Sequence, residues 1–215
     1  MLLSRRYLIP GGSCKERYKM LKLNRRIPRA LKLGLLTCSS VLVFSMTGCG
    51  SGTEAPVLER PQVSAELSIP QDFELSLIAD GVGVQIYECT DTNGTLGWTL
   101  RAPRADLLVN GEKVGNHFGG VDKAGFDPGA YWQSVDDENC WVRANANTIV
   151  KEANPGSIPL LRLEAAAVSG NCTFSDVAFI QRLETTGGVA PTEACALGDK
   201  KEIDYTAEYY FYTTP

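Results

Sequence analysis

The C-terminal stretch of this chain alternates apolar and polar residues, and that alternation constrains the fold more than any other feature of the sequence. From Ile203 to Phe211 every odd position is apolar or aromatic, whereas positions 204, 206 and 208 are polar. A period of two is the pattern of a half-buried β-strand and does not fit the 3.6-residue period of a helix. We therefore predict a terminal strand over residues 203–212 that pairs inside a sheet.

Short segments of the same kind recur through the rest of the chain, and no stretch has a long helical period. The expected strands cover residues 73–77, 82–89, 97–101, 105–109, 112–118, 131–135, 140–144, 160–168 and 177–184. Asn110-Gly111, between two of them, is a strong signal for a two-residue hairpin turn. Many short strands separated by Gly, Pro and Asn predict an all-β fold: a single antiparallel β-sandwich or barrel-like domain with long loops over residues 72–215.

The first 48 residues have the order of an export signal peptide. Basic residues precede an apolar run from Leu33 to Met46, which is shorter than the roughly 20 residues of a membrane-spanning helix. Met46-Thr-Gly-Cys49 at its end resembles the lipobox of bacterial lipoproteins. That resemblance implies cleavage after Gly48 and lipidation of Cys49, whose acyl chains would anchor the protein in a membrane. The alternative is an ordinary signal peptide that leaves Cys49 as a free thiol.

Three further expectations concern the leader and the residues after it. Met20 stands where the basic part of such a leader normally begins, which gives the hypothesis that translation starts there. Gly50 after the cysteine, by resemblance to Gram-negative sorting signals, suggests the outer membrane. Residues 49–71 are rich in Gly, Ser, Pro, Glu and Ala and predict a flexible lipidated tether. We thus expect an exported cell-envelope lipoprotein whose partner, through Cys49, is the membrane.

The chain after the leader is strongly acidic. Ten of the 21 Lys and Arg residues, but one of the 25 Asp and Glu residues, lie in residues 1–48, so residues 49–215 carry a formal charge of −13. Such a surface repels nucleic-acid phosphates, and nucleic acid is not expected as a partner. No cofactor is expected either, because Gly81-Val-Gly83 is followed by Ile86 where a dinucleotide fingerprint needs a third glycine.

Four cysteines lie beyond the leader and Cys49: Cys89, Cys140, Cys172 and Cys195. An even number in an exported domain predicts two disulfide bonds. Zinc is the competing use, but thiolate zinc sites usually contain close C-x-x-C pairs, whereas these cysteines are spread over about a hundred residues. Three connectivities are possible, and the spacing does not choose among them.

His117 is the only histidine of the chain and a weak candidate for a catalytic residue. A Ser-His-Asp or Cys-His arrangement must be built around it, and the chain contains no G-x-S-x-G elbow. Asp106, Glu112 and Asp122 are near in sequence, and a neighbouring carboxylate raises a histidine pKa toward general acid–base use. The competing interpretation gives His117 a structural hydrogen bond.

Two further groups of residues are weak candidates for binding. Trp98 and Trp132, together with His117, are candidates for a face that binds a sugar or an aromatic ligand, although rings at a period of two more often fill a β core. Asp136, Asp137 and Glu138 offer oxygen ligands of the kind that calcium prefers, yet they lack the spacing of an EF-hand loop. A solvated acidic turn is the favoured interpretation, and no metal site is predicted.

Several segments together resemble a known family. They are Gly83-Val-Gln-Ile-Tyr-Glu-Cys89, Trp98, Val114-Gly-Asn-His-Phe-Gly-Gly120, Ser157-Ile-Pro-Leu-Leu161, Phe179-Ile-Gln-Arg-Leu-Glu-Thr-Thr-Gly-Gly-Val-Ala-Pro191 and Tyr205-Thr-Ala-Glu-Tyr-Tyr-Phe-Tyr212. In order and spacing, over about residues 67–213, they resemble the DUF3455 family of uncharacterised secreted bacterial and fungal proteins.

The resemblance implies an extracytoplasmic β-rich domain and a pairing of the cysteines. Cysteines matching Cys89 and Cys195 recur in the family, which implies that these two form one bond and that Cys140 pairs with Cys172. The chain departs from the family pattern at residues 121–130, which stand before Tyr131-Trp132 where relatives continue directly into a Gly-Pro-Thr-Trp segment.

Two functions follow as hypotheses. The favoured one is a non-catalytic binding or structural domain for a small molecule, glycan or protein, which predicts a pocket lined by tryptophan and tyrosine without converging ionisable groups. The alternative is a hydrolase or other enzyme that uses His117 with a nearby carboxylate. It predicts that His117 lies exposed in a cleft within hydrogen-bond reach of Asp or Glu.

Overall fold

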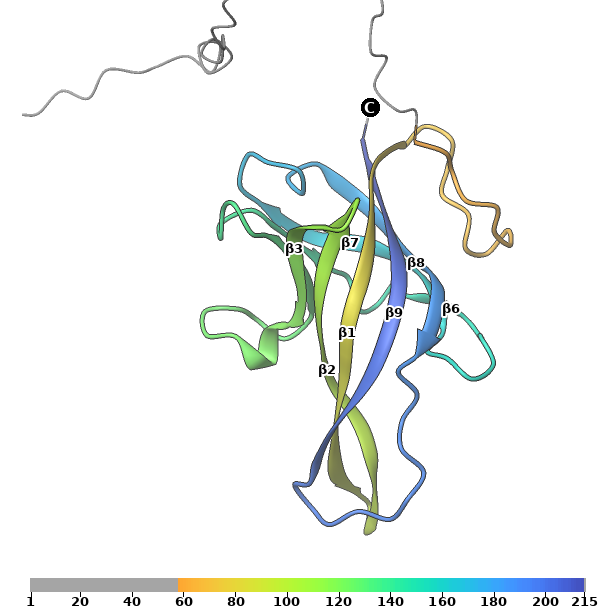
Figure 1. Ribbon diagram of the computed structural model, residues 1–215, viewed down its shortest axis with the longest axis vertical. Helices are drawn as coiled ribbons and strands as arrows, with labels where there is room; N and C mark the ends of the chain where they lie inside the picture. The colour runs from red at the N-terminus through yellow and green to blue at the C-terminus, as the bar shows by residue number, and fades with distance from the viewer. Residues whose placement is uncertain (1–57, 215) are drawn as a thin grey trace, which may run out of the picture. The chain divides into compact units, whose positions relative to one another are not determined.

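The computed structural model describes residues 58–214, whose regular elements are β-strands and one turn of 3₁₀-helix (Figure 1). The elements are β1 (Glu74–Thr92), β2 (Thr95–Val109), β3 (Glu112–Gly119), η1 (Gly120–Asp122), β4 (Ala130–Ser134), β5 (Trp141–Ala144), β6 (Val150–Glu152), β7 (Leu160–Ser169), β8 (Val177–Gly187) and β9 (Lys200–Thr213). No helix in this part of the chain is long and apolar enough to cross a membrane. The predicted leader, the lipidation site at Cys49 and the start of the predicted tether lie outside the described residues.

The strands form one antiparallel sheet that closes on itself. Their order is β5-β4-β3-β2-β1-β9-β8-β7-β6, and an additional pairing of β5 with β7 joins the two ends. Every strand except β6 therefore belongs to the ring, and β6 pairs with β7 beside it. Closure pairs the edges that an open sheet would leave free. The all-β prediction is confirmed, and of the two predicted architectures the structure has the barrel-like one.

β1 and β2 form one long hairpin where the sequence predicted four shorter strands (Figure 1). β1 runs unbroken through residues 78–81 and pairs with β2 on one side and β9 on the other. Register shifts, such as the one at Ile86/Tyr87, absorb irregularities without ending the strands. The turn between them has φ of 56° at Asn93 and 84° at Gly94, the left-handed conformation that a type I′ turn requires.

The segment before β1 packs against the outside of the barrel. Leu67 and Ile69 are 1% and 3% exposed and share an apolar cluster with Tyr212. Gln181 Nε2 also donates a hydrogen bond to the Leu67 carbonyl at 2.7 Å. The later part of the predicted tether therefore contacts the barrel through Leu67 and Ile69. These apolar side chains cover outward-facing aromatic rings that solvent would otherwise reach.

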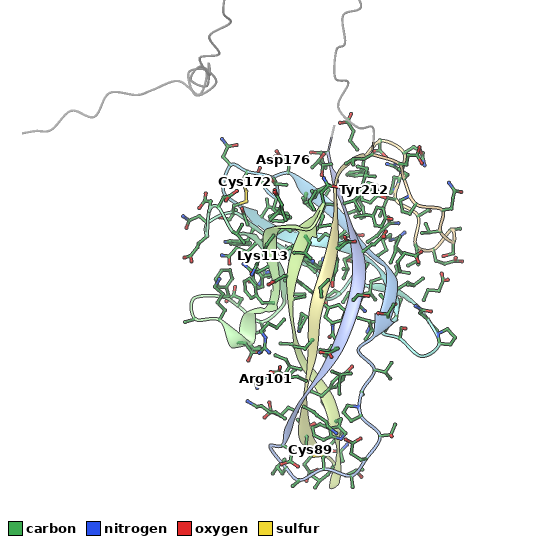
Figure 2. The ribbon with its side chains drawn as sticks, in the orientation of Figure 1. Cys89, Arg101, Lys113, Cys172, Asp176 and Tyr212 are labelled. Atoms are coloured by element: carbon green, nitrogen blue, oxygen red, sulfur yellow. A yellow bond between two sulfur atoms is a disulfide. The ribbon has the colours of Figure 1, made fainter. Side chains whose placement is uncertain are left out.

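Two disulfide bonds lie near opposite ends of the barrel, as the positions of Cys89 and Cys172 show (Figure 2). Cys89 on β1 is bonded to Cys195 in the connection between β8 and β9, and Cys140 before β5 is bonded to Cys172 in the connection between β7 and β8. This is the pairing that the family resemblance implies.

Residues 121–130, between β3 and β4, cover aromatic rings on the outside of these strands. Phe126 lies edge-on to Tyr131 with ring centroids 4.9 Å apart, and Tyr131 stacks on Phe118. Lys123 lies over the Phe118 ring and donates a hydrogen bond from Nζ to Gln133 Oε1 at 2.5 Å. The loop therefore seals one side of the barrel wall.

Candidate functional site

The interior of the barrel contains a cavity of about 340 Å³. Side chains from every strand of the ring line it, and most of its wall is apolar, with Ala144, Ile149, Ile158, Leu161 and Leu163 among the lining residues. The exposed residues Leu100, Ala146 and Lys151 also line it, so the cavity reaches the surface beside them. Its volume lies at the lower end of the range for small-molecule pockets, about 300–1,000 Å³.

Polar and aromatic side chains from distant parts of the sequence meet at this cavity. They are Gln85 and Tyr87 of β1, His117 of β3, Trp132 of β4, Arg182 of β8 and Tyr209 of β9. The antiparallel register brings them together in pairs, because His117 lies opposite Trp132 and Arg182 lies opposite Tyr209. Directly opposite residues of paired strands share a face of the sheet, here the inner one.

Arg182 is the only buried cation in residues 58–214, with 9% of its surface exposed. Its Nε and Nη2 donate hydrogen bonds to the Pro159 carbonyl at 3.2 and 2.8 Å, and the guanidinium also lies within hydrogen-bonding reach of the Tyr209 side chain. No carboxylate of residues 58–214 forms an ion pair with it. Because a charge removed from water is costly unless it is paired, this buried guanidinium without a carboxylate partner marks a candidate binding site.

His117 is buried and electrically neutral. Its Nδ1 lies 2.8 Å from the Tyr131 carbonyl oxygen, and since a carbonyl only accepts, Nδ1 carries the proton and Nε2 is an acceptor. Burial lowers the pKa of His117 to about 3; the hydrogen bond to Tyr131 opposes the shift, and the charge of Arg182 adds to it. The imidazole therefore stays uncharged at neutral pH.

Two of the carboxylates expected near His117, Asp106 and Asp122, line a hollow on the outside of the barrel together with His117, but within residues 58–214 neither makes a hydrogen bond to its imidazole. Asp106 pairs with Lys113, and Asp122 pairs with Arg101, through exposed or half-buried side chains. The prediction that a neighbouring carboxylate raises the pKa of His117 is wrong, because burial lowers it. Nor is His117 exposed in a cleft, since 3% of its surface is accessible.

The tyrosines at the cavity are also neutral. Burial raises the pKa of Tyr87, Tyr205 and Tyr209, and in each case the positive charge of Arg182 opposes the shift. Tyr87 donates its hydroxyl hydrogen to the Gly188 carbonyl at 2.7 Å, and the hydroxyls of Tyr205 and Tyr209 share a hydrogen bond of 3.2 Å. The charged residues that line the cavity, Arg182 and Lys151, are both cations.

Two buried donors on cavity-lining residues have no hydrogen-bond partner within residues 58–214. They are Nε2 of Gln85 and Nε1 of Trp132, and both residues are 1% exposed. An unsatisfied buried donor costs about 1–3 kcal/mol. The cavity therefore combines one unpaired cation with two unused donors, a set suited to an anionic or hydrogen-bond-accepting ligand.

The structure brings two of the three candidate ligand-binding residues together and leaves the third elsewhere. His117 stacks on Trp132, whereas Trp98 lies opposite Cys89 toward the tip of the β1–β2 hairpin. Trp98 Nε1 donates to the Glu193 carbonyl at 3.0 Å and does not line the cavity. Sequence reasoning missed Arg182, although its place two residues after Ile180 on the apolar face of a predicted strand was a usable signal.

The three candidate calcium ligands lie in the exposed turn between β4 and β5. Asp137 Oδ1 accepts a hydrogen bond from the backbone N–H of Asn139 at 2.9 Å, while Asp136 and Glu138 are exposed beside it. Within the described part of the chain, no three His, Cys, Asp or Glu side chains are grouped so that they could hold a metal ion. The turn is an acidic surface feature.

A second hollow lies on the outside of the barrel, but its principal charges are matched. It is lined by Arg101, Arg104 and Lys113, which pair with Asp122 and Glu88, with Glu202 and with Asp106 respectively. Exposed ion pairs of this kind are worth little. The other two cations of the hollow, Lys123 and Lys200, form no ion pair within residues 58–214, but neither is buried, so water solvates them. The interior cavity is therefore the candidate site.

One comparison with known proteins places the chain in a family. The family model described as "Protein of unknown function (DUF3455)" matches residues 70–213, from just before β1 to the end of β9. No curated protein and no solved structure matches the chain. The matched range contains every ring strand together with Arg182, His117 and Trp132. The chain therefore belongs to the DUF3455 family.

Proposed function

We propose that this protein is a non-catalytic binding protein of the cell envelope that holds a small molecule inside the barrel. The cavity of about 340 Å³ carries the proposal, because it is surrounded by a closed ring of strands and has a mostly apolar wall. An interior cavity of this size admits a small molecule but neither a folded protein nor a long glycan.

The proposed location rests on the leader and on the disulfide bonds. Met46-Thr-Gly-Cys49 supports lipidation of Cys49 after export. The bonds Cys89–Cys195 and Cys140–Cys172 support an oxidising compartment, since such bonds are rare in the cytosol. A lipid at Cys49 would hold the barrel at a membrane surface, where it captures its ligand.

The alternative, an enzyme built on His117, has less support. A general acid–base catalyst works best with a pKa near the operating pH, whereas burial lowers the pKa of His117 to about 3. Its proton is already committed to the Tyr131 carbonyl. A low pKa and a hydrogen bond to the backbone suit a structural role for His117 in the cavity wall.

Binding of the neutral dye N-phenyl-1-naphthylamine, which gains fluorescence in apolar sites, tests the proposed function. We expect saturable binding at one site per chain. Ala144→Phe fills the cavity and should weaken binding at least about tenfold, whereas Ala166→Phe, the same change at an exposed position of β7, should not. Equal binding by the native protein and a folded Ala144→Phe variant would show that the cavity is not the site.

Lipidation is tested separately. The chain should incorporate labelled palmitate and fractionate with membranes, and Cys49→Ala should abolish both. Membrane association without label in the native protein would contradict the lipoprotein part of the proposal and leave the binding function untouched.

A further inference from the structure

We propose that the molecule held in the barrel is an organic acid, whose carboxylate is bound by Arg182 and whose apolar body lies against the leucine and isoleucine side chains of the cavity. The inference rests on the proposed function and adds the chemical class of the ligand. It depends on the charge balance of the cavity, the orientation of the guanidinium and the character of the remaining wall.

The charge balance of the cavity favours an anionic ligand. Arg182 is buried and forms no ion pair within residues 58–214, and Tyr87, His117 and Tyr209, which also line the interior, are neutral. Lys151, the one other charged residue that lines the cavity, is an exposed cation at its opening. The described residues therefore place a full positive charge in a poorly solvated cavity without a counter-charge. Electrostatic attraction is far stronger there than in water. An anion that enters the cavity therefore neutralises the charge of Arg182, which no carboxylate of the described residues neutralises.

The orientation of the Arg182 guanidinium suits a carboxylate. Nε and Nη2 share the Pro159 carbonyl as acceptor, which fixes the plane of the group, and the neutral side chain of Tyr209 lies within hydrogen-bonding reach of it. No anionic acceptor within residues 58–214 contacts the guanidinium. A guanidinium held in this way presents parallel N–H groups that match the two oxygens of a carboxylate. Gln85 and Trp132 add unused N–H donors on neighbouring parts of the wall. The site is thus organised before the ligand arrives.

The rest of the wall decides between an inorganic and an organic anion. Ile149, Ile158, Leu161 and Leu163 line the cavity together with the rings of Trp132 and Tyr209. An inorganic anion would leave this apolar surface uncovered, whereas an acid with one or two rings, or a short alkyl chain, buries it. General attraction of anions cannot explain binding, because residues 49–215 carry a formal charge of −13.

Displacement of bound N-phenyl-1-naphthylamine by 2-naphthoate and by 2-naphthamide tests the inference. The two compounds share a ring system and differ in charge. We expect 2-naphthoate to displace the dye at a concentration at least about tenfold lower, because one charge-assisted hydrogen bond contributes more than the 1.4 kcal/mol that corresponds to about a tenfold change. Arg182→Met should reduce this ratio to about one.

Two further variants complete the experiment. Arg104→Met removes an exposed cation from the outer surface and should leave the ratio unchanged. Arg182→Lys keeps the charge but not the fork, and should lower the ratio at least about threefold. If Arg182→Met does not fold, as judged by circular dichroism, the native protein and Arg182→Lys still decide the question.

The outcomes separate the two proposals. Saturable dye binding with equal displacement by acid and amide in the native protein overturns the organic-acid inference and leaves the binding function standing. So does an acid preference that persists unchanged in a folded Arg182 variant. Absence of saturable dye binding, or binding that Ala144→Phe does not weaken, overturns both proposals.

Discussion

His117 lies flat against Trp132 in the barrel interior, with ring centroids 4.4 Å apart and ring planes inclined by 11°. Tyr209 lies edge-on beside both rings, with its ring centroid 5.2 Å from that of His117 and 5.6 Å from that of Trp132. A neutral imidazole packs well among these rings, but an imidazolium buried there would lose its hydration. Packing of the cavity wall therefore depends on His117 being neutral.

That link predicts a pH-dependent stability. The pKa of His117 is about 3 in the folded protein and roughly 6.5 in an unfolded chain. The unfolded state therefore binds the proton first as the pH falls. The contribution of His117 is complete above about pH 6.5 and is lost progressively down to about pH 3. When the pH falls from 8 to 5, the loss of this contribution should lower the free energy of unfolding by about 2 kcal/mol.

Urea unfolding of the native protein and of His117→Gln at the two pH values measures this effect. The variant should lose about 2 kcal/mol less than the native protein between pH 8 and pH 5. Because the chain has one histidine, no other imidazole contributes. The same pH dependence in both proteins would mean that His117 is not buried in its neutral form.

A second prediction concerns the close approach of β1 to Tyr209. A Cβ atom at Gly81 would overlap the ring of Tyr209, which is fully buried and packs against His117 and Trp132. Gly81→Ala should therefore lower the free energy of unfolding by about 1–3 kcal/mol. Gly97→Ala is the matched control, because a Cβ there meets nothing within 4 Å, and it should change stability by less than about 0.5 kcal/mol. Equal effects in thermal unfolding would contradict the prediction.

The strands and turns that sequence reasoning predicted are those with local signals. The alternation from Ile203 to Phe211 lies within β9, and Asn110-Gly111 turns between β2 and β3. Asn93-Gly94 carries the same signal and was available to predict the β1–β2 turn. The pairing of β5 with β7 that closes the barrel was beyond reach, because nothing local in either strand specifies that β5 pairs with β7 and not with β6, which follows it in the chain.

The candidate site shows the same limit. His117 and Trp132 were identified from residue type, but their stacking depends on the register of β3 and β4. Arg182 became significant only with barrel closure, because an arginine on an open sheet would extend to water. Whether a strand residue faces solvent or a sealed interior depends on pairing between distant strands, and the sequence pattern does not encode that pairing locally.

A third prediction tests the docking of the segment before β1. Leu67 is almost fully buried in the outer apolar cluster, and its carbonyl accepts a hydrogen bond from Gln181. Leu67→Ala should lower the free energy of unfolding by about 3 kcal/mol, the usual cost of emptying a buried leucine site. Leu96→Ala, at a position 46% exposed, is the control and should change it by less than about 0.5 kcal/mol. A negligible effect of Leu67→Ala would mean that this segment does not pack stably on the barrel and belongs to a flexible tether.

The last prediction ranks the two disulfide bonds. They join residues separated by 106 and 32 positions. In the chain-entropy model a bond stabilises by restricting the unfolded chain, more so for a longer loop, which gives about 5 kcal/mol for Cys89–Cys195 and about 4 kcal/mol for Cys140–Cys172. Each bond joins one buried and one half-buried cysteine, so that replacing both members by alanine removes similar packing.

The difference between the two double-alanine variants therefore reports loop length. In urea unfolding, Cys89→Ala/Cys195→Ala should be less stable than Cys140→Ala/Cys172→Ala by about 1 kcal/mol. The first bond also holds the connection before β9 against the long hairpin, whereas the second joins connections beside β5. If Cys140→Ala/Cys172→Ala were the less stable variant, the Cys140–Cys172 bond would stabilise the folded barrel directly, beside the β5–β7 pairing, and not only by restricting the unfolded chain.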